Sequence, residues 1–173
     1  MIEVLLILIL QSLLGGFDTI YYHEYQQRLA LKPSAAKELL LHGIRSIIYS
    51  IIYILLAWFE LRGIFVLILI LFFSIEIIIT LWDFVEEDRS RKLPAPERIM
   101  HSIMGIIYGI FLTLIAPILN SWWQTKTEII FVQYGHISIL LSLMSFGTLT
   151  SGLRDLMSSL TKKEFPKIWT RLL

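Results

Sequence analysis

The 173-residue chain contains no cysteine, and charged residues make up only 17% of it. Without a thiol, the protein can form no disulfide, no thiolate metal site and no cysteine nucleophile. The sequence also lacks a glycine-rich phosphate-binding loop, because the adjacent Gly15 and Gly16 lie within a long apolar run. No Ser-His-Asp arrangement stands out. Histidine and carboxylate side chains therefore remain as the candidates for chemistry.

Apolar residues make up 56% of the chain, and the mean hydropathy is +0.72. They occur in five runs of about the 20 residues that a helix needs to cross a bilayer. This pattern predicts an all-α fold, an integral membrane bundle of five transmembrane helices. We expect the spans near residues 2–22, 35–59, 64–85, 97–119 and 129–153, with Ser34 as the N-cap of the second span.

The predicted domain organisation is simple. Residues 1–160 form a single bundle domain, and residues 161–173 form a basic cytoplasmic tail. The first run is preceded by no basic segment and followed by no small-residue cleavage site. We therefore expect it to be a retained membrane helix rather than a signal peptide.

Basic residues are distributed unevenly between the two sides of the predicted bundle. Of the 15 lysines and arginines, only Arg62 and Lys126 fall on the side that holds the second and fourth loops. The other thirteen fall on the side of the first and third loops and the tail, which the positive-inside rule assigns to the cytoplasm. The N-terminus is then outside and the C-terminus inside. Because the basic residues follow this topology, we expect no nucleic-acid partner.

Polar residues spaced three and four apart share one face of a helix. Each of the first four spans carries one such stripe, and its other faces are almost entirely apolar. Lipid would contact the apolar faces, so the stripes should point at one another. The stripes are Gln11/Gly15/Asp18/Tyr22, Glu38/His42/Arg45/Tyr49, Glu76/Thr80/Asp83/Glu87 and Glu97/His101/Met104/Tyr108.

The predicted depths of these residues in the membrane also support a shared polar layer. With a rise of about 1.5 Å per residue, Arg45 and Glu76 lie about 15 Å below the cytoplasmic interface. An unpaired charge at the bilayer centre costs about 2.5–3.5 kcal/mol on insertion scales, so the matched depth predicts an Arg45–Glu76 ion pair. Four other ionisable residues come about 5–10 Å below the interface: Asp18, His42, Asp83 and His101.

The fifth span carries no such stripe. Its small residues Ser138, Ser142 and Ser145 recur at helical spacing, which predicts close packing against another helix.

Imidazole and carboxylate groups without a thiol suit Fe, Mn or Zn held within a helical bundle. Pairs four residues apart, such as Glu97 and His101, can direct two side chains to one point. The candidate metal ligands are Asp18, His42, Glu76, Asp83, Glu87, Glu97 and His101. The supporting polar residues are Tyr22, His23, Glu38, Arg45 and Tyr49.

Three interpretations of this polar layer remain open. In the first, the protein is a metal-dependent oxidoreductase or hydrolase that acts on a lipid-like substrate. In the second, the buried acids pair with loop arginines and fix the helix register, and the protein is a non-enzymatic scaffold or partner subunit. In the third, the layer is a path for protons or ions in a small carrier.

Four stretches carry a resemblance to a known family: "LLGGFDTIYYHE", "ELLLHGIRSIIY", "GLRD" and above all "LWDFVEEDRSRKLPAPERIMH". The chain resembles an uncharacterised family of small bacterial multi-span membrane proteins, some of which are joined to an NAD-dependent epimerase-like domain. The resemblance implies a multi-pass protein of the bacterial inner (plasma) membrane. It also implies a cytoplasmic NAD-dependent epimerase-like partner, but it assigns no catalytic residue.

Overall fold

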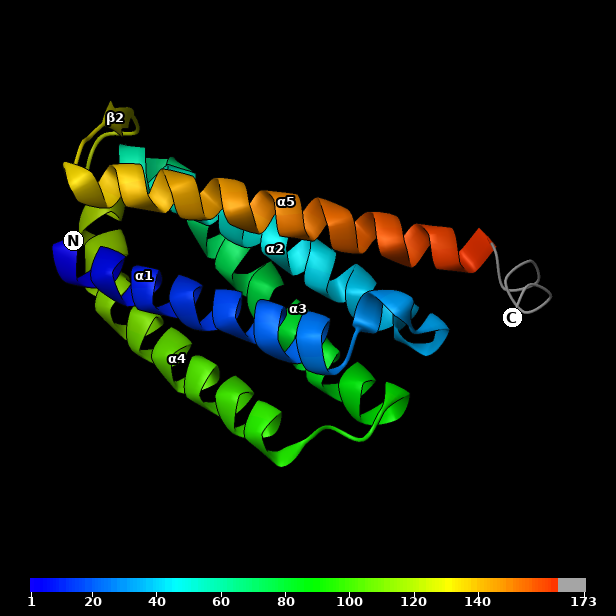
Figure 1. Ribbon diagram of the computed structural model, residues 1–173. Helices are drawn as coiled ribbons and strands as arrows, with labels where there is room; N and C mark the ends of the chain where they lie inside the picture. Colours follow the sequence, from blue (N-terminus) through cyan, green and yellow to red (C-terminus); the bar gives the residue numbers. More distant parts are fainter. Residues whose placement is uncertain (165–173) are drawn as a thin grey trace.

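The computed structural model describes residues 1–164, which form a bundle of five long helices (Figure 1). With the short helical segments that flank them, all five are long and apolar enough to cross a membrane, in agreement with the five predicted spans. The helices are α1 (Ile2–Phe17), α2 (Ala36–Trp58), α3 (Val66–Ser90), α4 (Ala95–Trp123) and α5 (His136–Glu164). A π-helical segment, Asp18–Gln26, continues α1, and the 3₁₀ turns Leu29–Leu31, Pro33–Ala35 and Gly63–Phe65 precede α2 and α3.

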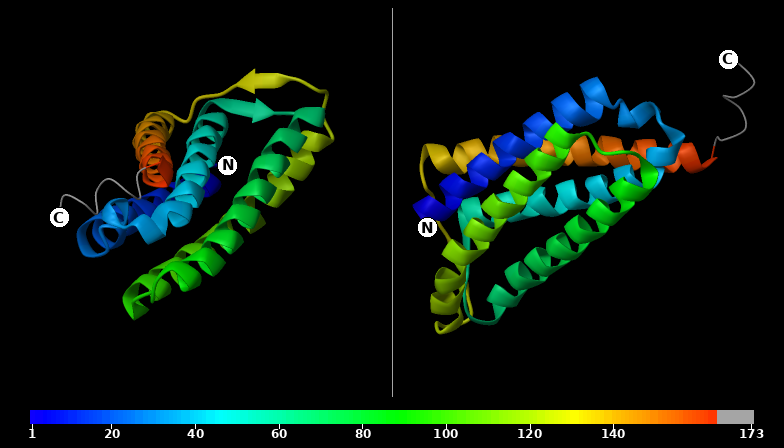
Figure 2. Two further views of the ribbon diagram at one scale, coloured as in Figure 1. Left: turned by 90° about the vertical axis from the view of Figure 1, so that its right-hand side faces the viewer. Right: turned by 90° about the horizontal axis from the view of Figure 1, so that it is seen from below.

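The two ends of the bundle are built differently (Figure 2). At the end that holds the N-terminus, called here the strand end, β1 (Phe59–Leu61) pairs antiparallel with β2 (Ile129–Phe131). This ribbon joins the α2–α3 connection to the α4–α5 connection. The opposite end, called here the basic end, holds the α1–α2 and α3–α4 connections.

Several predictions about the helix ends are wrong. The fifth helix begins at His136 and not near residue 129, because Ile129–Phe131 bonds to β1 as a strand. Ser34 is not a cap, since it lies within a 3₁₀ turn and Ala35 precedes α2 without a side-chain cap. Helix α4 continues through Pro117 to Trp123, because one missing N–H does not end a long apolar helix.

The structure describes only part of the predicted basic tail, residues 161–173. Helix α5 continues through residues 161–164, and residues 165–173 lie outside the described residues.

Helices α2 and α5 pack along a seam of small residues. A Cβ atom added to Gly152 would lie 3.0 Å from the backbone oxygen of Gly43, so only glycine allows this approach. One heptad further along, the Ser145 hydroxyl donates to the backbone oxygen of Ser50 at 2.9 Å. These contacts confirm the predicted close packing of the fifth span. The α2–α5 seam consists of four facing pairs at seven-residue intervals, as in an antiparallel coiled coil: Ala36/Ser159, Gly43/Gly152, Ser50/Ser145 and Ala57/Ser138.

The apolar core lies between the helices toward the strand end. The rings of Phe73 on α3 and Phe111 on α4 meet edge-on, with their centroids 5.4 Å apart. The outward faces are apolar as well, as a lipid-facing surface requires. Ile20 is 70% exposed, and the other widely exposed side chains include Leu71, Ile78, Ile106 and Leu143.

Candidate metal centre

The stripes of the first four spans meet at the basic end of the bundle. Each of four elements contributes two buried ionisable side chains to this polar layer, and the most exposed of the eight has only 6% of its surface accessible. The pairs are Asp18 and His23 on the π-helical segment, Glu38 and His42 on α2, Asp83 and Glu87 on α3, and Glu97 and His101 on α4. Residues four apart share a face on α2, α3 and α4, so these three pairs follow from ordinary helical geometry.

The pair on the first element depends on the change of winding at Asp18. In an α-helix, residues five apart point about 140° away from each other. In a π-helix, hydrogen bonds join residues five apart, so His23 lies one turn from Asp18 on the same face. The Nε2 atom of His23 is 3.2 Å from Oδ2 of Asp18. The π-helical segment therefore adds a histidine that a regular α-helix would direct elsewhere.

One group of possible ligands consists of Asp18, His23 and His101, whose ligand atoms all lie within 4.8 Å of one another. His101 directs Nε2 to Oδ2 of Asp18 at 3.3 Å and Nδ1 to Oε2 of Glu87 at 3.2 Å. With Nε2 as a ligand atom, a hydrogen bond from Nδ1 to Glu87 would fix the tautomer and the ring orientation. Such second-shell partners accompany most metal-binding histidines.

A second group consists of His23, His42 and Glu87, again with ligand atoms within 4.8 Å of one another. Nε2 of His42 is 3.7 Å from Oε1 of Glu87. The rings of His23 and His42 stack with their centroids 4.4 Å apart. The two groups share His23, so together they place five donor side chains around one small volume.

Two carboxylate oxygens of the layer are buried without a partner among residues 1–164: Oδ1 of Asp18 and Oδ1 of Asp83. The ring nitrogens of His23, His42 and His101 lie 2.9–3.2 Å from carboxylate oxygens of the layer. Unpaired buried polar atoms are uncommon in native structures and need an explanation. Ligand atoms about 2.0–2.2 Å from one metal ion lie about 3–3.5 Å from each other. The distances around Asp18 and His101 are in this range, so the donor set fits a bound Fe, Mn or Zn ion.

Two arginines neutralise the remaining acids. Arg91 lies between Glu38 and Glu97, with Nη2 2.8 Å from one carboxylate and 2.7 Å from the other. Burial opposes its charge, but the hydrogen bonds that Arg91 donates to Glu97 and Glu38 outweigh this effect and raise the pKa of Arg91 above its ordinary value. Arg91 thus stays cationic between two carboxylates that are not exposed to solvent.

The predicted Arg45–Glu76 pair is wrong. Nη1 of Arg45 lies 2.9 Å from Oδ2 of Asp83, which is two turns nearer the basic end than Glu76 on the same face of α3. The predicted depth is that of the Arg45 backbone, whereas the long side chain carries the guanidinium toward the basic end. Because Asp83 also lies 2.9 Å from Nε2 of His42, the arginine and the histidine share one carboxylate.

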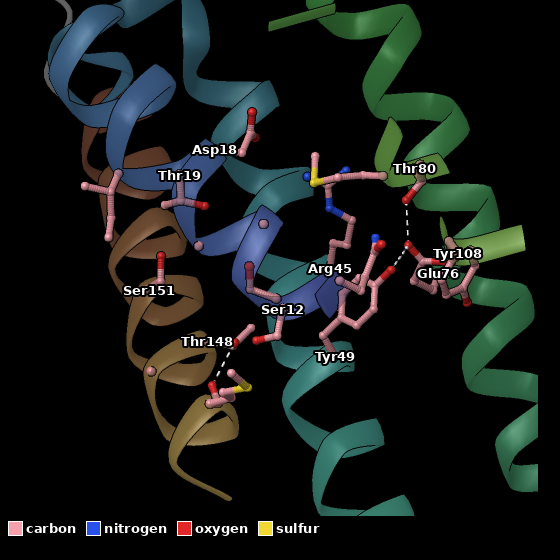
Figure 3. A pocket seen from close by; sticks show the side chains of 18 of the residues that line it. Ser12, Asp18, Thr19, Arg45, Tyr49, Glu76, Thr80, Tyr108, Thr148 and Ser151 are labelled. Carbon is pink, nitrogen blue, oxygen red and sulfur yellow. Dashed lines mark hydrogen bonds between the residues drawn. The ribbon is translucent and has the colours of Figure 1, made fainter. Parts of the chain in front are cut away.

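Glu76 and Tyr49 lie in neither three-residue group. Oε1 of Glu76 accepts hydrogen bonds from the Tyr49 hydroxyl at 3.0 Å and the Thr80 hydroxyl at 2.7 Å (Figure 3). Tyr22 is buried beside the layer and packs edge-on against Phe17. Sequence reasoning gave His23 a supporting role and treated Arg91 as one of several loop cations, yet both contact the centre of the layer.

A cavity of about 630 Å³ adjoins the polar layer. Asp18 and His101 form part of its wall, and so do Glu76 and Tyr108 further toward the strand end (Figure 3). Residues of all five helices line it. No protein-family model, curated protein or solved structure matches the chain. Its function is therefore inferred from the chemistry of these residues.

Proposed function

We propose that this protein is an integral membrane metalloenzyme, an oxidoreductase or hydrolase that holds Fe, Mn or Zn in the polar layer and acts on a lipid-like substrate. One observation carries the proposal: buried histidine and carboxylate atoms from four elements lie within 4.8 Å of one another in two groups, and Oδ1 of Asp18 in one of them has no partner among residues 1–164. Intramembrane ionisable residues are costly and usually mark a function. The adjoining cavity, with apolar bundle surface around it, supports a lipid-like substrate.

The proposal assigns roles to the residues of the layer. Asp18, His23 and His101 would hold the ion, with His42 and Glu87 completing the ligand set. Asp83 would lie beside the ligand set, paired with Arg45 and in contact with Nε2 of His42. When bound, the ion supplies a Lewis acid or a redox centre. The cavity brings the substrate to Asp18 and His101 and keeps it away from bulk water.

The same proposal includes a location. The basic end would face the cytoplasm of a bacterial cell, with the N-terminus on the outer side of the inner membrane, because the sequence pattern assigns thirteen of the 15 basic residues to the cytoplasmic side. A cytoplasmic NAD-dependent epimerase-like protein, which the family resemblance suggests, would then meet the basic end. Such a partner could supply or consume the product of a reaction at the polar layer.

The test is elemental analysis of protein purified without chelator or added metal. We expect near-stoichiometric Fe, Mn or Zn in the wild type, lost in His42→Ala and His101→Ala. His136→Ala is the matched control, because His136 is an exposed histidine at the start of α5 and outside the layer. Folded wild-type protein that contains no metal, or histidine variants that keep it, would contradict the proposal.

A second candidate function rests on the ion pairs of the layer. Arg91 binds Glu38 and Glu97, and Arg45 binds Asp83, so much of the buried charge is paired within the protein. In this alternative the protein is a membrane scaffold whose buried network fixes the helix register. Metal-free protein whose folding depends on Arg45 and Arg91 would favour it.

A further inference from the structure

A second set of polar residues repeats the polar layer two helical turns closer to the strand end. Seven residues of helix span about 10 Å. Each of four residues of the polar layer has a polar residue seven positions away on the same helical span, toward the strand end. The pairs are Asp18 and Gln11, His42 and Tyr49, Asp83 and Glu76, and His101 and Tyr108. The second members of these pairs, called here the tyrosine layer, all line the cavity of about 630 Å³. The cavity therefore has polar groups at two levels, and only the level at the basic end carries histidine.

The tyrosine layer offers hydrogen-bond acceptors that have no donor. Oε2 of Glu76 and Oε1 of Gln11 are buried and make no hydrogen bond within the described residues. Their residues are only 2% and 8% exposed. Tyr49 and Thr80 both donate to the other oxygen of Glu76. The Tyr108 hydroxyl of the same layer is also buried without a hydrogen-bond partner in the described residues. An occupant that satisfies the layer must therefore both donate and accept hydrogen bonds.

The charges around the cavity favour a neutral occupant. Both signs of charge face the cavity, because its lining includes the arginines Arg45 and Arg154 and the acids Asp18, Glu24 and Glu76. Arg45 would repel a cationic head group, and Glu76 would repel an anionic one. A hydroxyl group can donate to Glu76 or Gln11 and accept from Tyr108 without adding a charge, and the tyrosine rings provide apolar surface beside it.

The cavity has an approach from the side of the bundle, between α1 and α5. Gly15 and Gly16 on α1 and Gly147 on α5 belong to its lining, and a Cβ atom added to any of them would meet nothing within 4 Å. Ile20, another lining residue, is 70% exposed on the outer surface. Small residues thus leave an opening at the depth at which lipid chains would lie.

We infer that the cavity binds a neutral lipid that bears a hydroxyl group and enters between α1 and α5. In the tyrosine layer the hydroxyl donates to Glu76 and accepts from the Tyr108 hydroxyl. A part of the molecule about 10 Å from that hydroxyl then lies against Asp18 and His101. The inference rests on the proposed function for the identity of the bound molecule as substrate, whereas the binding itself does not require a metal.

The experiment uses the full chain in nanodiscs of phosphatidylcholine, a lipid without a hydroxyl donor. The probe is a sixteen-carbon alcohol that carries a photoreactive diazirine, compared with its methyl ether, carboxylic acid and trimethylammonium analogues. We expect the alcohol to label cavity residues such as Met104 and Met144, and Glu76→Leu to reduce this labelling about tenfold. Ser74→Leu is the control, because Ser74 is an exposed residue of the same helix. Its hydroxyl donates to the backbone oxygen of Ile70, one turn earlier.

A second variant covers the possibility that Glu76→Leu fails to fold. Gly147→Leu should block the opening and reduce labelling by the alcohol, whereas Gly109→Leu should not. Both glycines have open space where a side chain would lie, but only Gly147 lines the cavity. Neither change should disturb the packing of the helices, so a difference between them reports on access.

The outcomes separate this inference from the proposed function. Equal labelling by the alcohol and its methyl ether, or stronger labelling by either charged analogue, overturns the inference. Labelling that Glu76→Leu and Gly147→Leu leave unchanged does the same. Alcohol labelling of the cavity in wild-type protein that contains no metal contradicts the proposed function and upholds the binding site. Metal loss in His42→Ala with labelling retained supports both.

Discussion

The polar layer and the α2–α5 seam both bury polar atoms in an apolar bundle, but they satisfy those atoms differently. In the seam, the hydroxyls of Ser138, Ser145 and Ser159 each donate to a backbone oxygen of α2. In the polar layer, Oδ1 of Asp18 and Oδ1 of Asp83 have no partner among residues 1–164. The seam hydroxyls are thus satisfied by the protein itself, whereas two oxygens of the layer could still accept a contact from a bound ion. We therefore expect changes in the seam to affect stability alone and changes in the layer to affect binding as well.

The largest expected effect tests whether the paired part of the layer contributes to stability. Arg91→Leu leaves Glu38 and Glu97 buried without their cation, and breaking a buried ion pair in this way costs about 3–5 kcal/mol. We expect a large fall in the free energy of unfolding, measured by thermal or denaturant unfolding in detergent. Arg98→Leu is the control, because its partner Asp88 and Arg98 itself are more than half exposed. An effect no larger than that of the control would show that the layer does not depend on this arginine.

A metal ion should stabilise the layer and leave the seam unaffected. A ligand present at 100 times its Kd raises the free energy of unfolding by about 2.7 kcal/mol. We expect added Fe, Mn or Zn to raise the melting temperature of metal-depleted wild-type protein and of Ser145→Ala. Glu87→Gln should lose this response, since it removes a member of one ligand group and the carboxylate that orients His101. A rise of the same size in Glu87→Gln would show that the ion binds elsewhere.

The smallest expected effect concerns the seam itself. Ser145→Ala removes the contact with the Ser50 hydroxyl and the hydrogen bond to the Ser50 backbone oxygen, both 2.9 Å long. We expect a loss of about 1 kcal/mol in the free energy of unfolding, with the metal content unchanged. Thr113→Val is the matched control, because the exposed Thr113 hydroxyl bonds only within its own helix. A loss of metal in Ser145→Ala would show that the seam and the polar layer are not independent of each other.

The convergence of the polar stripes could be predicted from the sequence because it follows from helical periodicity. Residues four apart on α2, α3 and α4 share a face wherever those helices lie, so Glu38 and His42, for example, had to point the same way. The seam was also visible, since small residues at helical spacing indicate close packing. Both features depend on local geometry that a single sequence determines.

The features that the sequence did not reveal depend on other kinds of information. The place of His23 follows from the π-helical winding after Asp18, which a search at the α-helical period cannot detect. The strands Phe59–Leu61 and Ile129–Phe131 are three residues long, too short for a period-two pattern to emerge. Arg45 was matched to Glu76 by backbone depth, although its side chain reaches Asp83.

The ribbon of β1 and β2 has a mechanical consequence. It fastens the ends of α2 and α3 to those of α4 and α5, where Arg62 and Val132 add backbone hydrogen bonds beyond the strands. When a helix that is fixed at one end tilts, its other end is displaced the most. Any rocking of these helices would therefore pivot about the ribbon and open the bundle most widely at the far end, where His23, His42 and His101 lie.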